Sequence, residues 1–278
     1  MPEQPDHSPL VDGLSCEEEK WVDQEGEEEE EDEELASLFV KEREQHRSHD
    51  LRALDTDMSL TNARGRAVDW MLKVIARVGF SALTGILGLN YLDRFLVSFC
   101  YQKDQPWMIQ IASVACLSLA AKVEETQVPL LLNLQEVVKS EYLFKARDIQ
   151  RMELLVLSTL SWKMHPLTPI SFVDHIVRRL ELRTHLRWEF LGRCERLLLT
   201  VLSADSRSVV YLPSVLATAT MLHVIDQVEP FHSLEYRNQL LGVLDMTQDD
   251  VNGCYELIQD QLPVTRTTTG DNQPQCTS

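Results

Sequence analysis

The sequence predicts an all-α protein in which two helical domains follow an acidic N-terminal segment. Apolar residues recur every three to four positions through most of the chain, which is the period of an amphipathic helix. Alternating β-branched patterns, which are typical of strands, are nearly absent. Prolines separate the periodic segments, and several stand where a helix would begin. With 278 residues and 44% apolar content, the chain can bury one large core or two modest ones.

Residues 1–34 are predicted to be disordered. They contain three prolines and the run "EEEEEDEE" from Glu27 to Glu34, where like charges repel and little apolar surface is available. Residues 1–50 carry 19 acidic and 4 basic side chains, against 25 acidic and 22 basic in the rest of the chain. The body is therefore nearly neutral, which disfavours a protein that wraps nucleic acid and needs a basic face.

Five helices are expected in the first half. "ELASLFVKEREQHRS" places Leu35, Leu38 and Phe39 on one face of a leading amphipathic helix. "ARGRAVDWMLKVIARVGF" and "ALTGILGLNYLDRFLVSF" continue the helical period. Pro106 opens "PWMIQIASVACLSLAAKVEE", which has small residues on most faces, so we expect this helix to be the central and most buried one. "FKARDIQRMELLVLSTLSW" follows and ends before His165.

The second half predicts a further helical set. Thr168 and Pro169 suit the N-cap and first position of a helix over "ISFVDHIVRRLEL". Three more segments follow: "RWEFLGRCERLLLTVLSAD", "PSVLATATMLHVID" and "TQDDVNGCYELIQDQL". After Pro213, an aliphatic and a small residue stand at the same offsets as after Pro106, 107 residues earlier. This weak repeat suits two stacked domains of about 100 residues, although chance would also produce it.

The sequence predicts no catalytic residue, metal site or cofactor. The polar, acidic N-terminus is neither a secretory signal nor a transit peptide, and no stretch approaches ~18 uninterrupted apolar residues. Phosphate-binding, zinc-protease and hydrolase motifs are missing, so an unrecognised helical enzyme has no positive support. The six cysteines show no metal-ligand spacing and are expected to be free thiols of a reducing compartment. They are Cys16, Cys100, Cys116, Cys194, Cys254 and Cys276.

Several segments, in chain order, resemble the cyclin box: "RGRAVDWMLKV", "NYLDRFL", "LSLAAKVEE", "VPLLLNLQ" and "RMELLVLSTLSW". The segment "AAKVEETQVPLLLNLQ", together with an N-terminal L-x-C-x-E, is similar to the corresponding segments of plant D-type cyclins. The resemblance implies tandem five-helix cyclin-fold bundles, preceded by a disordered acidic segment and a short helix. It divides the chain after residue 34 into a cyclin box with its leading helix (35–165), a C-terminal domain (166–263) and a flexible tail (264–278).

The resemblance implies a regulatory subunit that binds and activates a cyclin-dependent serine/threonine kinase and performs no chemistry itself. Lys122 in "AAKVEE" and Glu153 in "RMELL" match the two charged residues that contact the kinase's regulatory helix. Val123 and Glu125 are assigned to the same contact, and Val123 is smaller than the apolar residue of many cyclins. Without the resemblance, Lys122 and Glu153 would be interpreted as solvated charges on helix faces.

Further positions match structural and docking residues of the family. Arg64 matches the arginine that pairs with the aspartate of "YLDRF", here Asp93. Trp70 and Gln110 match two positions of a patch that docks substrate motifs containing arginine and leucine. Lys73 stands where an acidic residue usually receives the substrate's arginine. A lysine repels an arginine, so the patch is expected to be weak or altered in specificity.

The motif "LSCEE" places Leu14, Cys16 and Glu18 on one side of an extended segment. The resemblance implies that these residues fill a groove on a retinoblastoma-type pocket protein and so promote the G1/S transition. A motif with three fixed positions out of five occurs by chance in about a few per cent of chains of this length. The alternative is therefore a solvated acidic tail with no binding role. The position of the motif ahead of a D-type cyclin box favours recruitment.

The remaining expectations concern partners and location. The resemblance allows kinase inhibitor proteins as partners and predicts no nucleic-acid or membrane partner. It places the protein in the nucleus and leaves a cytoplasmic pool open, although no compact Lys/Arg import signal is visible. The alternative function is that of a cyclin-fold transcription factor of the IIB type, which binds DNA. A steep dependence of DNA affinity on salt would favour it.

Overall fold

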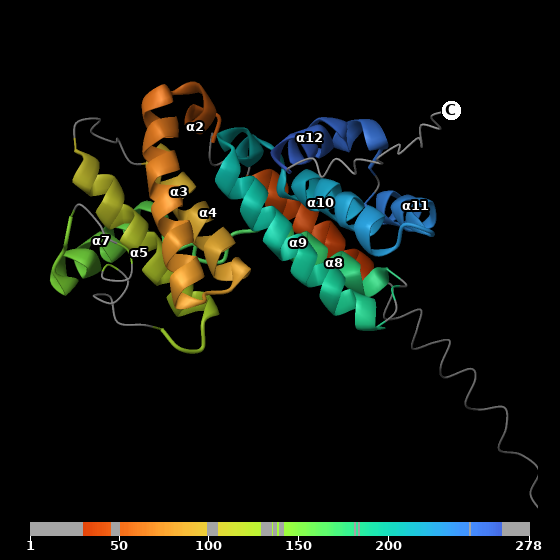
Figure 1. Ribbon diagram of the computed structural model, residues 1–278, viewed down its shortest axis with the longest axis horizontal. Helices are drawn as coiled ribbons and strands as arrows, with labels where there is room; N and C mark the ends of the chain where they lie inside the picture. The colour runs from red at the N-terminus through yellow and green to blue at the C-terminus, as the bar shows by residue number, and fades with distance from the viewer. Residues whose placement is uncertain are drawn as a thin grey trace, which may run out of the picture.

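The computed structural model describes most of the chain as two helical bundles side by side (Figure 1). The described residues are 30–45, 51–98, 105–128, 135, 138, 142–180, 182, 184–244 and 246–262. No strand occurs among them. The predicted all-α fold class is confirmed.

The first bundle is built around one central helix. Its helices are α2 (Ala53–Thr56), α3 (Met58–Val78), α4 (Ala82–Ser98), α5 (Pro106–Glu124) and α7 (Ala146–Thr159). α5 packs against α3, α4 and α7, as its small side chains predict. Between residues 128 and 142 only Gln135 and Val138 are described.

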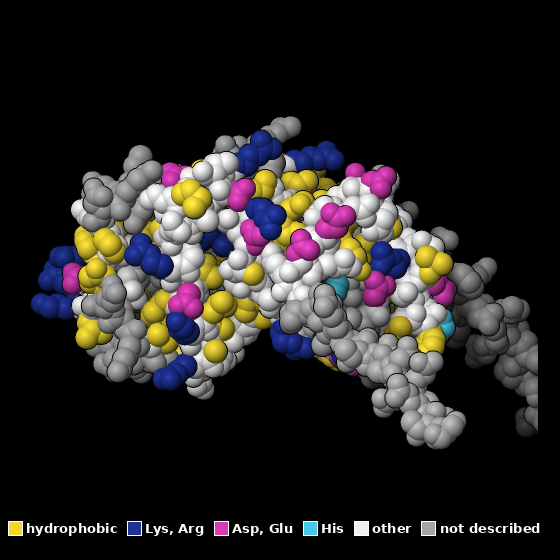
Figure 2. Space-filling model, turned by 45° about the horizontal axis from the view of Figure 1, so that its top comes forward, with side chains coloured by type: hydrophobic (Ala, Val, Ile, Leu, Met, Phe, Trp, Pro, Cys, Tyr) yellow, Lys and Arg dark blue, Asp and Glu magenta, His cyan; other side chains and the backbone are white. Residues whose placement is uncertain are grey.

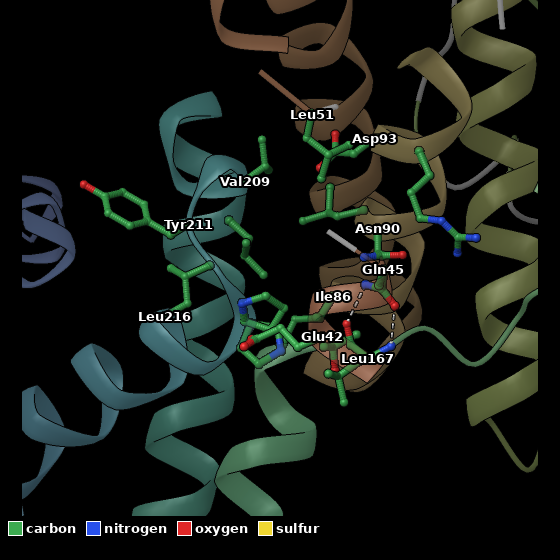
Figure 3. Close-up of a pocket in the computed structure, with 16 residues that line it drawn as sticks. Glu42, Gln45, Leu51, Ile86, Asn90, Asp93, Leu167, Val209, Tyr211 and Leu216 are labelled. Carbon is green, nitrogen blue, oxygen red and sulfur yellow. Dashed lines mark hydrogen bonds between the residues drawn. The ribbon is translucent and has the colours of Figure 1, made fainter. Parts of the chain in front are cut away.

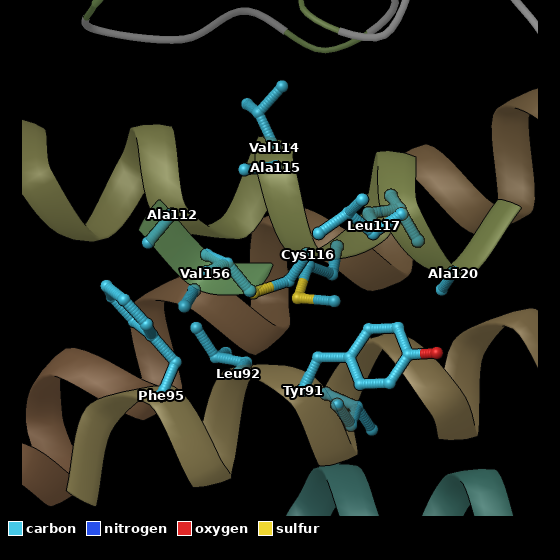
Figure 4. Packing of buried hydrophobic residues seen from close by; sticks show 14 of the residues in the cluster. Tyr91, Leu92, Phe95, Ala112, Val114, Ala115, Cys116, Leu117, Ala120 and Val156 are labelled. Carbon is cyan, nitrogen blue, oxygen red and sulfur yellow. The ribbon is translucent and has the colours of Figure 1, made fainter. Parts of the chain in front are cut away.

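α5 allows close approach because small side chains cover its buried faces. Ala112, Ala115 and Ala120 are fully buried, and Figure 4 shows Ala112 and Ala120 on the side of α5 that faces Leu92 and Tyr91 of α4. Among the described helices, α5 alone has a length and apolar content compatible with a membrane span, but 67% of that stretch is buried inside the protein. Burial of this extent is typical of the core helix of a bundle.

The second bundle repeats this plan. Its helices are α8 (Pro169–Arg179), α9 (Thr184–Ala204), α10 (Pro213–Val228), α11 (Ser233–Val243) and α12 (Gln248–Gln261), with the short 3₁₀ helix η1 (Ser206–Val210) between α9 and α10. α10 packs against α8, α9, α11 and α12. Like α5, it begins with a proline in its first turn, so the two proline-led helices hold equivalent central places. Thr168 forms the predicted cap of α8, in a capping box with Ser171.

The leading helix covers residues 30–45 and therefore begins inside the acidic run, five residues before the predicted start at Leu35. Its first carboxylates are paired across the fold. Arg179 of α8 contacts Glu31 at 3.0 Å and Asp32 at 2.7 Å. Acidic side chains are also favourable near a helix N-terminus. Disorder was predicted for residues 30–34 because their like charges repel, and this part of the prediction is wrong: pairing with Arg179 reduces the repulsion.

The leading helix packs on the second bundle, although the sequence analysis grouped it with the first. The Phe39 ring lies 5.4 Å from that of Phe172 in α8. The Glu42 carboxylate accepts hydrogen bonds from the backbone N–H and hydroxyl of Ser214, at 2.6 and 2.9 Å. Ser214 is in the first turn of α10, so Glu42 satisfies a backbone donor that a helix start leaves without a partner. The leading helix thus braces the second bundle.

A buried ion pair joins the two bundles. Arg64 of α3 donates to both carboxylate oxygens of Asp93 in α4, at 2.7 and 3.1 Å, and to the backbone carbonyl of Leu202 in α9, at 2.7 Å. Both charged side chains are at least 94% buried. Burial alone would lower the pKa of Arg64, but the charge and hydrogen bonds of Asp93 outweigh it and raise the pKa. The structure therefore forms the predicted pair and ties it to the domain interface.

The three cysteines that the structure describes are unpaired and buried. They are Cys116, Cys194 and Cys254. Burial raises the pKa of each thiol, that of Cys254 to about 12. These thiols are therefore unreactive core side chains, as free cysteines in a packed interior usually are.

Candidate functional site

Lys122 and Glu153 meet where the end of α5 lies against α7. The Lys122 ammonium donates to Oε1 of Glu153 at 2.6 Å, and the Ser118 hydroxyl donates to the same oxygen at 2.6 Å. Glu153 is 6% exposed, whereas the side chain of Lys122 is 43% exposed. The carboxylate is thus held in the protein and fixes an ammonium group at the surface, where its other N–H groups can donate to a partner.

Large apolar side chains are exposed on the same two helices and in the turn after α7. Val123 follows Lys122 in the chain and Leu154 follows Glu153; their exposed fractions are 36% and 56%. Trp162, just past α7, is 65% exposed. In Figure 2 hydrophobic side chains lie among Lys and Arg side chains at the left end of the first bundle. Exposed apolar groups beside a charged pair are typical of a protein–protein contact.

Trp162 projects from a strained turn. It and the residue before it have φ angles of 59° and 54°, in the left-handed region that non-glycine residues rarely adopt. Tyr91 donates to the carbonyl of Met164, and Arg94 donates to the carbonyl of Lys163 at 3.1 Å. These two bonds hold the turn in place. Strain retained at an exposed tryptophan suggests that the position of this side chain is functional.

Sequence reasoning did not assign Leu154 or Trp162 to the site. The helical period of α7 could have revealed Leu154, because it places this apolar residue on the polar face of the helix. No local signal marks Trp162, because its exposure depends on how the turn after α7 packs against α4. We use the name α5–α7 face for the exposed parts of α5, of α7 and of the turn after α7, which carry Lys122, Val123, Glu153, Leu154 and Trp162.

Glu125, which the sequence analysis assigned to the partner contact, serves the start of α4. Its Oε1 atom accepts from the backbone N–H of Ser81 at 2.9 Å and from the hydroxyl of Thr84 at 2.6 Å. Burial alone would raise the pKa of Glu125, but these hydrogen bonds outweigh it and lower the pKa. A contact between Glu125 and a partner stays a prediction, and the structure gives this carboxylate an internal role.

The predicted docking residues lie on α3 and α5, which pack together. Trp70 is 7% exposed, and its indole N–H has no hydrogen-bond partner among the described residues; the same holds for Nε2 of Gln110. Lys73 is exposed and pairs with Asp69, one turn earlier, at 2.6 Å. The ion pair between Lys73 and Asp69 was not predicted. It partly neutralises the Lys73 charge, which would otherwise repel an incoming arginine.

Comparison with protein families decides the identity of the fold. The model "Cyclin, N-terminal domain" matches residues 33–165, and "Cyclin, C-terminal domain" matches residues 167–275. The chain belongs to the cyclin family.

Relatives of this cyclin include plant D-type cyclins. Cyclin-D3-1 of Arabidopsis thaliana is 58% identical over 85% of this chain and 61% of its own length. Cyclin-D3-2 of the same plant is 50% identical over 84% of this chain and 62% of its length, and Cyclin-D2-2 of rice, Oryza sativa subsp. japonica, is 38% identical over 72% and 55%. This cyclin therefore spans about three fifths of the length of the Arabidopsis relatives. The predicted resemblance to plant D-type cyclins is confirmed.

A solved structure supports the two-bundle fold. The crystal structure of a viral cyclin from herpesvirus saimiri superimposes with a TM-score of 0.64, covering 82% of this cyclin and 97% of that chain. At 15% identity, this likeness concerns the fold alone. The predicted pocket-protein residues Leu14, Cys16 and Glu18 lie outside the described residues.

Proposed function

We propose that this cyclin is a regulatory subunit that binds and activates a cyclin-dependent serine/threonine kinase. The observation that supports it is the α5–α7 face, where buried Glu153 holds Lys122 at the surface among exposed apolar side chains. The face lies on the most deeply packed helix of the first bundle, so it is a rigid platform. Membership of the cyclin family supports the same conclusion.

The proposed mechanism is a population shift in the kinase. Lys122 and Glu153 offer donors and an acceptor to backbone groups of the kinase's regulatory helix, while Val123, Leu154 and Trp162 supply apolar contact. Binding that favours the inward position of that helix completes the lysine–glutamate pair that positions ATP phosphates. A shift from 1:99 to 99:1 requires about 10⁴-fold tighter binding to the active kinase state.

Calorimetric titration of the chain with a purified plant cyclin-dependent kinase catalytic subunit tests the proposal. We expect a saturable 1:1 complex with a negative heat-capacity change, because the contact buries apolar surface. Absence of binding to every plant kinase of this class would contradict it.

We further propose that the segment "LSCEE" recruits a retinoblastoma-type pocket protein to the kinase and thereby promotes the G1/S transition. The proposal rests on the alternate spacing of Leu14, Cys16 and Glu18 and on the acidic residues nearby, which favour encounter with a basic rim. Action in the nucleus, and binding of kinase inhibitor proteins, are proposals that depend on these partners.

The Cys16→Ala variant is expected to slow phosphorylation of a pocket-protein fragment by about tenfold or more, because it removes a buried anchor. Phosphorylation of a short generic peptide by the same complex should not change, because that substrate does not need the motif. Ser15→Ala, on the opposite side of the extended segment, is the matched control. Equal rates for wild type and Cys16→Ala on the pocket-protein fragment would refute recruitment through this motif.

The docking surface around Trp70 and Gln110 is proposed to bind Arg–Leu motifs weakly. A Lys73→Glu variant offers a carboxylate in place of a paired ammonium, so we expect its affinity for an Arg–Leu docking peptide to rise about two- to fivefold, in the range of an exposed ion pair. Lys73→Ala removes the positive charge and adds no carboxylate, so its affinity for the peptide should lie between those of the wild type and Lys73→Glu. Fluorescence titration measures all three, and an unchanged affinity in Lys73→Glu would exclude the charge argument.

A further inference from the structure

A cavity of about 80 Å³ lies at the junction of the two bundles and the leading helix. Figure 3 shows Asn90 and Asp93 of α4 on one side of it and Val209, Tyr211 and Leu216 on the other. Its walls are largely apolar. Glu42 and Gln45 of the leading helix also line it. A ligand here would touch both bundles at once.

Two polar atoms of residues that line the cavity are buried without a hydrogen-bond partner among the described residues: Oδ1 of Asn90 and Nε of Arg94. These residues are one turn apart on α4, so they lie on the same face of the helix. Arg94 is 3% exposed. Its guanidinium has one hydrogen bond, to the carbonyl of Lys163, and no ion pair in the described part of the chain. Orphaned buried polar atoms are costly and rare in a packed interior.

The unpaired atoms need opposite partners. Oδ1 of Asn90 accepts a hydrogen bond, and the Nε–H of Arg94 donates one. A molecule that carries one donor and one acceptor would satisfy both. Burial also lowers the pKa of Arg94, because it removes the guanidinium from water.

The charges around the cavity argue for a neutral ligand. Asp93 is already paired with Arg64 at 2.7 Å, and Glu42 accepts two hydrogen bonds from Ser214. An anion would be attracted by Arg94 but repelled by both carboxylates. The Arg94 guanidinium would equally repel a cation.

We propose that this cavity is a binding site for a compact neutral molecule with a carboxamide or hydroxyl group. Its polar group bonds Asn90 and Arg94, and its small apolar part fills the space between Val209 and Leu216. The volume is roughly half that of the ~150 Å³ cavity that accommodates benzene, so the ligand is smaller than a benzene ring. Such a ligand would stiffen the joint between the bundles. It would also share Arg94 with the turn that carries Trp162.

Three isosteric probes test the charge and hydrogen-bond argument: acetamide, acetate and acetamidinium. Each is titrated into the full isotope-labelled chain while the Asn90 side-chain amide and the backbone amides of Val209 and Leu216 are followed by NMR. We expect saturable shifts with acetamide alone, with a dissociation constant on the order of 1 mM for so small a ligand. Shifts that stay linear with acetamide, or that saturate equally with all three probes, would overturn the proposal.

Two variants localise the binding. Asn90→Leu removes the orphaned acceptor and keeps the volume, so it should weaken acetamide binding at least about tenfold without loss of thermal stability. Val209→Leu fills the cavity from the opposite wall and should exclude acetamide while both polar atoms remain. Unchanged acetamide affinity in both variants would refute this location. A crystal soaked in acetamide that shows water alone in the cavity would refute the site itself.

Discussion

The Arg64→Met variant is expected to lose about 3–5 kcal/mol of unfolding free energy. The substitution leaves the Asp93 carboxylate buried without its cation, and it leaves the Leu202 carbonyl without the donor that it has at 2.7 Å. Since domains of this size are stable by only ~5–15 kcal/mol, the loss should be large enough to lower the urea midpoint clearly. Equilibrium urea unfolding followed by circular dichroism measures it.

Two controls separate the buried pair from a general effect of charge. The double variant Arg64→Met/Asp93→Leu should regain most of the loss, because apolar side chains replace both charges. Lys73→Ala breaks the exposed pair with Asp69, whose side chains are 58% and 65% exposed, and should cost no more than about 1 kcal/mol. A loss from Arg64→Met no larger than that from Lys73→Ala would show that the buried pair contributes little.

The Lys122→Ala/Glu153→Ala variant is expected to bind the kinase at least ~100-fold more weakly and to lose activation. Truncating buried polar partners at an interface costs about 2–5 kcal/mol, and here the change also leaves Ser118 without its acceptor. Calorimetric titration measures the affinity. Glu153→Gln keeps the shape of the side chain and its acceptor for Ser118, so it isolates the contribution of the charge.

Matched surface variants guard against a folding effect in that experiment. Arg151→Ala removes an exposed charge from the same helix as Glu153, and Trp188→Ala removes a tryptophan that is 76% exposed on the second bundle. Neither should alter kinase affinity. Trp162→Ala, by contrast, should weaken it, because this side chain lies on the α5–α7 face. Equal losses from Trp162→Ala and Trp188→Ala would argue against the face.

Local patterns in the sequence predict most of the helices, and the family resemblance singles out the charged residues of the first bundle. The small residues of α5 predict its central position, whereas the central position of α10 was not predicted. The Lys122–Glu153 and Arg64–Asp93 pairs could not be derived from spacing, because their members are 31 and 29 residues apart. Matching Arg64 and Asp93 to the cyclin box correctly predicted their ion pair. Lys122 and Glu153 were matched to a contact with the kinase, and their bond to each other was not predicted.

The features that were not predicted from the sequence depend on contacts between residues far apart in the chain. The leading helix starts at residue 30 because Arg179, 148 residues after Glu31, neutralises its first turn. Glu125 serves the start of α4 through Ser81, which is 44 residues away. The exposure of Trp162 follows from the packing of its turn against Tyr91 and Arg94. No local propensity encodes contacts of this range.

The most direct test of the regulatory role is reconstitution of kinase activity. A purified plant cyclin-dependent kinase catalytic subunit is assayed on a generic peptide, alone, with the wild-type chain and with the Lys122→Ala/Glu153→Ala variant. We expect the wild type to raise the phosphorylation rate by orders of magnitude, and we expect the variant not to raise it although it folds as the wild type does. A wild-type chain that leaves every such kinase at its basal rate, or a variant that activates as well as wild type, would contradict the regulatory role.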